Sequence, residues 1–110
     1  MNDPLSPHVG IIVLNWNGCA DTIDCIESIK KIGYPHYSLI IVDNGSTDGS
    51  ETIIRKQFPE ITVLQTGNNL GFAGGINAGL KHGLEKGMDY LLALNNDTVI
   101  DPEAVGELVK

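Results

Sequence analysis

The chain has 110 residues, of which 42% are hydrophobic and 19% charged, and its formal net charge is -7. One domain, or part of a larger one, fits this length, and the hydrophobic content suffices for a core. The acidic balance argues against nucleic acid or an anionic lipid surface as the main partner, because both would be repelled, whereas an anionic ligand could still bind through a metal ion and backbone N–H groups.

The sequence favours a soluble protein of the cytoplasm. No run approaches the roughly 20 apolar residues of a membrane span, and the first eight residues lack the basic region and apolar core of a signal peptide. Cys19 and Cys25 form neither a CxxC nor a zinc pattern, so we predict small, mostly buried thiols in a reducing compartment rather than a disulfide. Membrane association of a longer parent protein stays open.

The first predicted strand covers residues 9–14, a continuous apolar and β-branched run typical of a strand covered on both faces. A helix follows, because Ile23, Ile26 and Ile29 recur at helical spacing with charges between them. Two lysines and then Gly33 close this pattern, as expected at a helix C-terminus.

The second buried-strand pattern covers residues 39–42 and leads into a dense turn cluster. Asp48 then stands as a helix N-cap, with Glu51 three residues on in a capping-box arrangement. This helix should run to about residue 58, before a proline. A third strand is predicted at residues 61–64.

A glycine-rich segment precedes the third predicted helix. The apolar positions of this helix recur every four residues, at Ile76, Leu80 and Leu84. Its glycines also recur every four residues, at Gly75, Gly79 and Gly83. Each glycine costs a helix about 1 kcal/mol relative to alanine. We therefore predict that another backbone approaches this stripe closely.

The fourth strand is predicted at residues 90–94, and Asp101 and Pro102 then read as N-cap and first residue of a final helix. No stop signal ends that helix before residue 110, which suggests an amino-terminal fragment of a longer protein. Strands and helices thus alternate throughout, which predicts an α/β fold with an open, mainly parallel sheet and flanking helices, a Rossmann-like arrangement.

All four loops that follow the predicted strands are polar. They read NWNG at residues 15–18, DNGSTDGS at 43–50, TGNNLGFAGG at 66–75 and NNDT at 95–98. Because such loops converge on one crevice at the carboxyl edge of an open parallel sheet, together they predict a ligand site.

These loops carry a family resemblance. NLGFAGGINAGL at residues 69–80 and LNNDT at residues 94–98 resemble the amino-terminal half of family 2 glycosyltransferases with the GT-A nucleotide-sugar-binding fold, and are most similar to a rhamnosyltransferase-like branch. The resemblance runs from residue 9 to about residue 102. It implies a UDP- or dTDP-sugar donor, Mg²⁺ or Mn²⁺, a saccharide or lipid-linked acceptor, and a place in cell-wall or polysaccharide biosynthesis.

The resemblance implies that Asp97 is the last acid of the DxD motif, which holds a divalent cation against the donor diphosphate, and that Asn96 contacts the nucleotide. One carboxylate suffices in principle, because Mg²⁺ keeps several waters and takes phosphate oxygens. Asn95 stands where the motif begins with Asp, and its neutral carbonyl oxygen would bind a cation more weakly. The alternative for this loop is an Asx-rich turn that starts the next segment.

Asp43 matches the acid that accepts a hydrogen bond from the N3–H of uracil or thymine in this family. A carboxylate only accepts, so it would reject cytosine, whose N3 also accepts. The alternative is a turn-starting Asp bonded to its own loop amides.

Other nucleotide contacts implied by the resemblance are Leu14, Asn15 and Asn17 at the base and ribose, and Gly74, Gly75 and Asn77 near the diphosphate and sugar. Glycines permit that approach, and a helix beginning near Ala73 could offer N–H groups to an anion. Packing is an equal alternative for Trp16, and Asn77 could simply cap or pack.

The resulting prediction is the donor-binding region of an inverting glycosyltransferase that uses a hydroxyl acceptor. Such a reaction needs a general base, which the family places beyond residue 110, while Asp101, Glu103 and Glu107 read as helix cap and helix surface. We assign no catalytic residue and predict little or no turnover by these 110 residues. The alternatives are a nucleotidyltransferase of related fold, which would want a basic first loop that residues 15–18 lack, and a non-catalytic nucleotide-binding or structural module.

Overall fold

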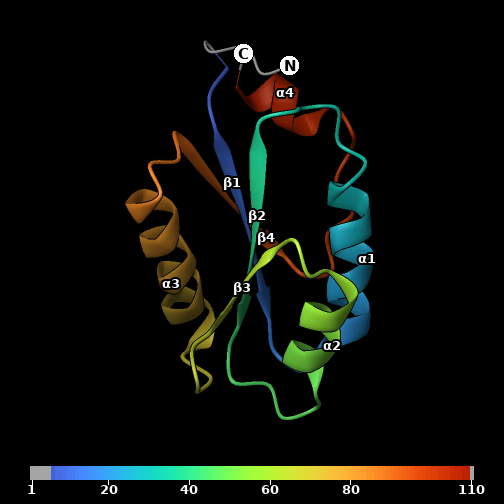
Figure 1. Cartoon of the computed structure of the whole chain (residues 1–110), viewed down its shortest axis with the longest axis vertical. Coiled ribbons are helices and arrows are strands. Elements are labelled where there is room, and N and C mark those ends of the chain that lie inside the picture. The colour runs from blue at the N-terminus through green and yellow to red at the C-terminus, as the bar shows by residue number, and fades with distance from the viewer. Residues whose placement is uncertain (1–5, 110) are drawn as a thin grey trace.

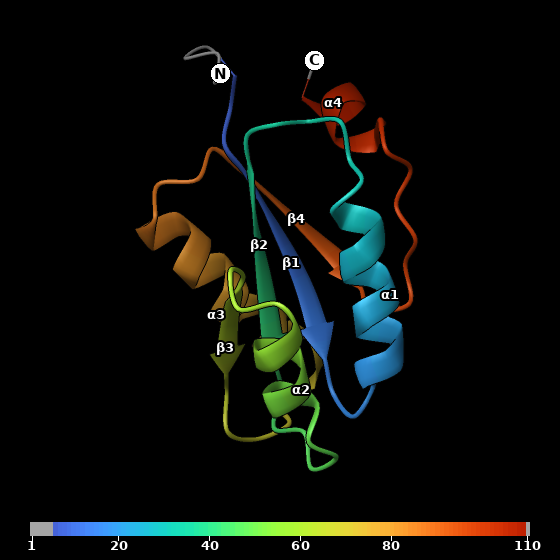
Figure 2. The same cartoon turned by 45° about the vertical axis from the view of Figure 1, so that its right-hand side comes forward.

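Strands and helices alternate along the part of the chain that the computed structural model describes, residues 6–109. The elements are β1 (Val9–Asn15), α1 (Cys19–Ile29), β2 (Tyr37–Asp43), α2 (Ser50–Gln57), β3 (Thr62–Gln65), α3 (Gly71–Glu85), β4 (Tyr90–Asn95) and α4 (Ala104–Leu108). Figures 1 and 2 show α1 and α2 on one face of the sheet and α3 on the other. The predicted α/β class and the order of elements are confirmed.

The sheet is parallel throughout, with strand order β3-β2-β1-β4. Its register aligns the strand ends, since Asn15 pairs with Asp43 and Asp43 pairs with Gln65, while Leu14 pairs with Asn95. The polar loops therefore start from one edge of the sheet, as the sequence predicts.

The two faces of the sheet support separate apolar clusters, because successive side chains of a strand point to opposite faces. Ile11 and Val13 belong to the larger cluster, which includes Ile26 of α1. Ile12 belongs to the smaller one with Ile76 of α3. The continuous apolar run of β1 is thus explained by burial on both faces.

The short apolar run at residues 90–94 is typical of a buried parallel strand, and this interpretation of β4 is wrong. Among residues 6–109 the strand pairs only with β1, so it forms one edge of the four-stranded sheet, and Tyr90 is 53% exposed. Sheet order, which the apolar run itself does not encode, decides this exposure.

The predicted capping box at α2 is also wrong. The N-cap is Gly49, with φ of 83°, and Asp48 instead accepts a hydrogen bond from the Ser50 N–H at 2.9 Å. The carboxylate of Glu51 accepts hydrogen bonds from Gln65 at 2.6 Å and Arg55 at 2.9 Å rather than turning back to the helix start. The Glu51 carboxylate therefore binds the side chains of Gln65 and Arg55 instead of the backbone at the helix N-terminus.

Helix α4 begins two residues later than predicted. Asp101 Oδ1 accepts from the Glu103 N–H at 2.8 Å, which folds Pro102 and Glu103 into a turn before the helix starts at Ala104. The helix ends at Leu108 instead of continuing to residue 110, which lies outside the described residues.

The glycine stripe of α3 faces the sheet. A Cβ added at Gly75, Gly79 or Gly83 would lie 2.3–2.6 Å from a side-chain carbon of Leu14, Ile12 or Leu91, respectively. Close approach is confirmed, but side chains of the sheet make it, where we predicted a backbone. The buried face of α3 follows the glycines, which leaves Leu84, one of the three predicted apolar positions, 69% exposed.

Candidate nucleotide site at the carboxyl edge of the sheet

A chain of hydrogen bonds runs along the carboxyl edge of the sheet from β4 to β3. Asn96 Nδ2 donates to Thr22 Oγ1 at 3.2 Å, and Thr22 Oγ1 donates to Asn15 Oδ1 at 2.5 Å. Asn15 Nδ2 donates to Asp43 Oδ1 at 2.9 Å, and Gln65 Nε2 donates to Asp43 Oδ2 at 2.7 Å. Every donor meets an acceptor, so this network is internally satisfied.

Asp43 is the buried centre of this network and has an exposed fraction of 0%. Its Oδ1 also accepts from Ser46 Oγ at 2.5 Å. Within the described part of the chain, its side-chain oxygens accept from the side chains of Asn15, Ser46 and Gln65, not from the loop amides that the turn alternative requires. The residue predicted to read a base thus lies beneath its neighbours, with both carboxylate oxygens engaged.

Asn17 joins the loops that follow β1 and β2. Its φ is 49°, a left-handed conformation that asparagine tolerates better than most residues. Its Oδ1 accepts from the Thr47 N–H at 2.8 Å, and its own N–H donates to Ser46 Oγ at 2.9 Å. The structure therefore brings Asn15, Asn17 and Asp43 together.

Asn44 is an organising residue that the sequence did not predict, and it is buried. Its Nδ2 donates to Gly71 O at 3.0 Å, and its Oδ1 accepts from Thr66 Oγ1 at 2.8 Å and the Leu70 N–H at 3.2 Å. It fixes the glycine-rich loop against the end of β2. The sequence feature that could have indicated this role is the position of Asn44 in a dense cluster of turn residues.

The NNDT loop forms a turn in which the Thr98 N–H donates to Asn95 O at 3.1 Å. Asn95 and Asp97 are exposed, whereas Asn96 packs against Gly18 and joins the network. No group of three or more His, Cys, Asp or Glu side chains within residues 6–109 could hold a metal. The exposed oxygens of Asn95 and Asp97 fit a Mg²⁺-type ion only if ligand phosphates and water complete its shell.

The amino-terminal end of α3 starts at Gly71, two residues earlier than predicted, and Asn69 Oδ1 already accepts from the Gly71 N–H at 2.9 Å. Gly75 is buried against Leu14, so packing alone accounts for this glycine. An added Cβ at Gly74 would lie 2.7 Å from Leu70 Cβ, and Asn77 is exposed on the helix.

An open pocket of about 200 Å³ lies beside the NNDT loop. Its lining residues come from the ends of β1 and β4, the loops that follow them, and the start of α3, and are Leu14, Trp16, Phe72, Asn95 and Asn96. Trp16 is 51% and Phe72 57% exposed, so neither aromatic ring belongs to the core. Phe72 was not predicted as a site residue.

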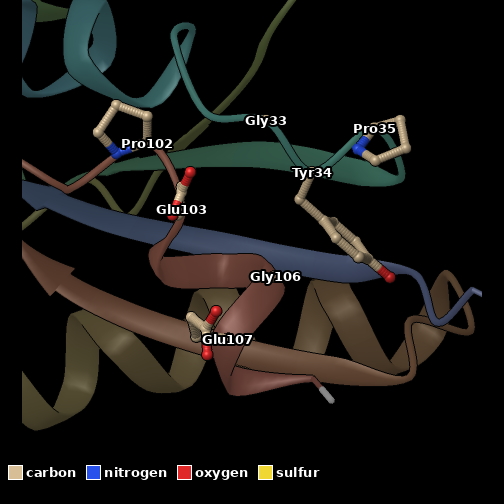
Figure 3. A pocket seen from close by; sticks show the side chains of 7 residues that line it. All are labelled: Gly33, Tyr34, Pro35, Pro102, Glu103, Gly106 and Glu107. Carbon is tan, nitrogen blue, oxygen red and sulfur yellow. The ribbon is translucent and has the colours of Figure 1, made fainter.

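A larger cavity, of about 440 Å³, lies near the opposite end of the sheet between α4 and the loop before β2, and Figure 3 shows its lining residues. Glu103 and Glu107 line it together with Tyr34 and two prolines, whereas none of the predicted nucleotide or metal residues does. Cavity size therefore does not locate the site, and the convergence of the polar loops does.

Both cysteines are free thiols, as predicted, and Cys25 is buried. Burial, followed by the negative charge of Asp97, raises the pKa of the Cys25 thiol to about 11. We expect alkylation of Cys25 at pH 8 to be more than about 100-fold slower than that of free cysteine, because only the thiolate reacts. Mass spectrometry of the iodoacetamide-treated Cys19→Ala variant measures this rate, and labelling as fast as free cysteine would contradict it.

The part of the chain from residue 6 to residue 109 contains no helix with both the length and the apolar character needed to span a membrane.

Similar proteins of known sequence are glycosyltransferases. The chain is 28% identical over 98 residues to the poly-beta-1,6-N-acetyl-D-glucosamine synthase of Staphylococcus epidermidis, covering 87% of this chain and 23% of that protein. It is 28% identical over 107 residues to glycosyltransferase GlyG of Streptococcus pneumoniae, covering 94% of this chain and 35% of that protein. The chain thus spans about a quarter to a third of the length of these relatives.

Solved structures share the fold. The mannosyltransferase PcManGT of Pyrobaculum calidifontis, in complex with GDP-Man and Mn²⁺, superposes with a TM-score of 0.81 at 21% identity, covering 93% of this chain and 31% of that one. TarS 1-349 of S. aureus, in complex with UDP-GlcNAc, gives a TM-score of 0.81 at 21% identity, covering 92% of this chain and 30% of that one. The fold is the GT-A fold that the resemblance implied.

The family model of glycosyl transferase family 2 matches residues 10–110, nearly the entire chain. The chain therefore belongs to glycosyl transferase family 2.

Proposed function

We propose that these 110 residues are the donor-binding part of a glycosyltransferase domain that takes a sugar from a UDP- or dTDP-sugar and transfers it to a hydroxyl acceptor. The observation that carries the proposal is the meeting of Asn15, Asn17 and Asp43 at one sheet edge with the exposed Asp97 loop. The general base, and with it the predicted inverting outcome, is assigned to a segment outside this chain, since its relatives are about three to four times longer.

Asp97 is the proposed metal ligand, with Asn95 as a weaker second oxygen. A bound Mg²⁺ or Mn²⁺ would neutralise charge on the departing nucleoside diphosphate. The Mn²⁺ in the PcManGT complex supports the use of a divalent ion in this fold. Asn96, which is fixed on Gly18 and Thr22, would hold this loop against the loop after β1.

The proposed place for the sugar is the pocket between Trp16 and Phe72, next to Asn95 and Asn96. No charged side chain lines it, and its exposed rings offer apolar faces, which suits a neutral hexose. The NLGFAGG and LNNDT segments support a rhamnosyltransferase-like activity, whereas the named relatives and neighbours include an N-acetylglucosamine polymer synthase and a protein bound to UDP-GlcNAc. Binding of dTDP-rhamnose and UDP-GlcNAc separates these two possibilities.

Two other functions remain to be tested against this one. A nucleotidyltransferase would need basic side chains in the first loop to bind a triphosphate. Residues 15–18 contain no Lys or Arg, which argues against this function. A non-catalytic module would bind no nucleotide, or would bind it without metal.

We expect uridine or thymidine diphosphate to bind this chain only in the presence of Mg²⁺ or Mn²⁺, and Asp97→Ala to lose that binding. Isothermal titration calorimetry with UDP, dTDP, GDP and CDP, with and without metal, measures both effects. Asp89→Ala is the matched control, because Asp89 lies at the opposite end of β4, where it holds the His8 N–H at 2.8 Å. Equal UDP binding by wild type and Asp97→Ala would refute the metal assignment, and no binding to a well-folded chain would favour the structural module.

A further inference from the structure

Gln65 makes hydrogen bonds through both ends of its carboxamide. Its Nε2 donates to Asp43 Oδ2 at 2.7 Å and to Glu51 Oε1 at 2.6 Å. Its Oε1 accepts from the N–H groups of Gly45 at 3.1 Å and Gly67 at 2.8 Å. The partners fix this orientation, because ionised carboxylates only accept and backbone N–H groups only donate.

The two oxygens of Asp43 differ in how they are held. Oδ1 accepts from Asn15 and Ser46, and Asn15 is itself fully buried. Oδ2 accepts from Gln65, which is exposed at the end of edge strand β3. Because Asp43 has no exposed surface, a ligand can reach it only if a covering group moves. Of the three side chains that donate to the Asp43 carboxylate, Gln65 is the exposed one.

Gln65 donates to Asp43 the same kind of hydrogen bond that a uracil or thymine ring would donate. Both present an N–H next to a carbonyl oxygen, and both would direct it at a carboxylate, which can only accept. Cytosine lacks this imide N–H. The internal contact therefore has the chemistry of the base contact assigned to Asp43.

The Gln65 amide nitrogen has a second carboxylate acceptor, Glu51, in the same position from which it donates to Asp43. Glu51 Oε1 accepts from the same nitrogen, and the Glu51 carboxylate is held by Arg55 Nε at 2.9 Å. Arg55 Nη2 in turn donates to Val63 O at 2.9 Å, which ties this second acceptor to β3. Gln65 can therefore leave Asp43 and keep one charged acceptor.

We propose that Gln65 occupies the base-recognition oxygen of Asp43 in the free protein, and that a uracil or thymine nucleotide displaces it toward Glu51. This inference rests on the proposed function, in which Asp43 reads the base. Gln65 is then a positioning residue, and nucleotide binding exchanges one hydrogen bond to Asp43 for another.

The test compares UDP binding by wild type and Gln65→Met in the full 110-residue chain, with Mg²⁺ present. Methionine has a similar length but no N–H to compete for Asp43. We expect UDP to bind about tenfold more tightly to Gln65→Met, with no such gain for CDP, because the lost competitor is a hydrogen bond to a charged group. A merely structural role for Gln65 predicts the opposite sign, since losing four hydrogen bonds would loosen the site.

The matched control is Glu51→Ala, which removes the other acceptor of the Gln65 nitrogen and leaves its bond to Asp43. It should not tighten UDP binding. Unchanged or weaker UDP binding by a cooperatively folded Gln65→Met protein would overturn the proposal. If that variant does not fold, NMR spectroscopy of wild type labelled with ¹⁵N-glutamine tests the proposal instead. Side-chain amide resonances of Gln65 that shift at UDP saturation support the proposal, and resonances that do not shift overturn it.

Asp43→Asn separates the failure of this inference from that of the proposed function. Wild type that binds no UDP, or Asp43→Asn protein that binds it equally well, would remove the base-recognition role and the exchange with it. If Asp43→Asn weakens UDP binding but Gln65→Met does not tighten it, only the proposed displacement of Gln65 is overturned, and the base-recognition role of Asp43 stands.

Discussion

Asp43→Ala is expected to lower the free energy of unfolding by about 3 kcal/mol, because it removes a buried acceptor of hydrogen bonds from Asn15, Ser46 and Gln65. Asn15, which is fully buried, would keep only the longer contact from its Nδ2 to Ser46 Oγ at 3.2 Å, whereas the exposed Gln65 keeps Glu51. Urea denaturation followed by circular dichroism measures the loss as a lower midpoint. The same variant should lose UDP binding if Asp43 reads the base.

Asp24→Ala provides the comparison for this stability effect. It removes a carboxylate of the same kind from the exposed face of α1, where alanine is also the better helix former. We expect little change in its unfolding midpoint. Equal midpoints for Asp43→Ala and wild type would show that the polar network along the sheet edge contributes nothing to stability.

Gly79→Ala is expected to lower the free energy of unfolding by about 2 kcal/mol, although alanine favours a helix by about 1 kcal/mol. The added Cβ would lie 2.6 Å from Ile12 Cγ2 and 3.2 Å from Val42 Cγ2. Both are β-branched side chains on central strands and both are fully buried, so neither can rotate away. Thermal and urea unfolding measure the change.

Gly106→Ala is the matched substitution, since it lies in α4 with no atom within 4 Å of the added Cβ. It should raise the free energy of unfolding by about 0.5–1 kcal/mol through helix propensity alone. Should Gly79→Ala be stabilising to the same extent, the close packing of α3 on the sheet would not be the reason for its glycines.

The strands were predictable because their apolar runs are short, continuous and bounded by turn residues. The exposure of β4 was not, since its run resembles that of β1 while its edge position depends on which strands pair. The predicted N-cap of α2 was wrong for a related reason. Glu51 has the right spacing for a capping box, but Gln65 and Arg55 compete for its carboxylate.

The gathering of the polar residues at one sheet edge was predictable, but their contacts were not. Asn15, Asp43 and Asn96 stand in polar loops or at strand ends, where a ligand edge is expected. Thr22 and Gln65, which complete the network, lie inside a helix and at the end of a strand and belong to no motif. Their role depends on the register that sets Asn15 beside Asp43 and Asp43 beside Gln65, and a local pattern does not encode that register.

The edge position of β4 also has a consequence for the order in which the protein assembles. Pairing between β1 and β4 joins residues about 80 positions apart, such as Val9 and Tyr90, while β1, β2 and β3 follow one another more closely. Closing the longer loop costs more chain entropy, so β4 should dock late and open early. In the proposed donor complex, a metal held by Asp97 and a nucleotide held at Asp43 would fasten this late strand to the early ones, so that the ligand itself completes the folding of its site.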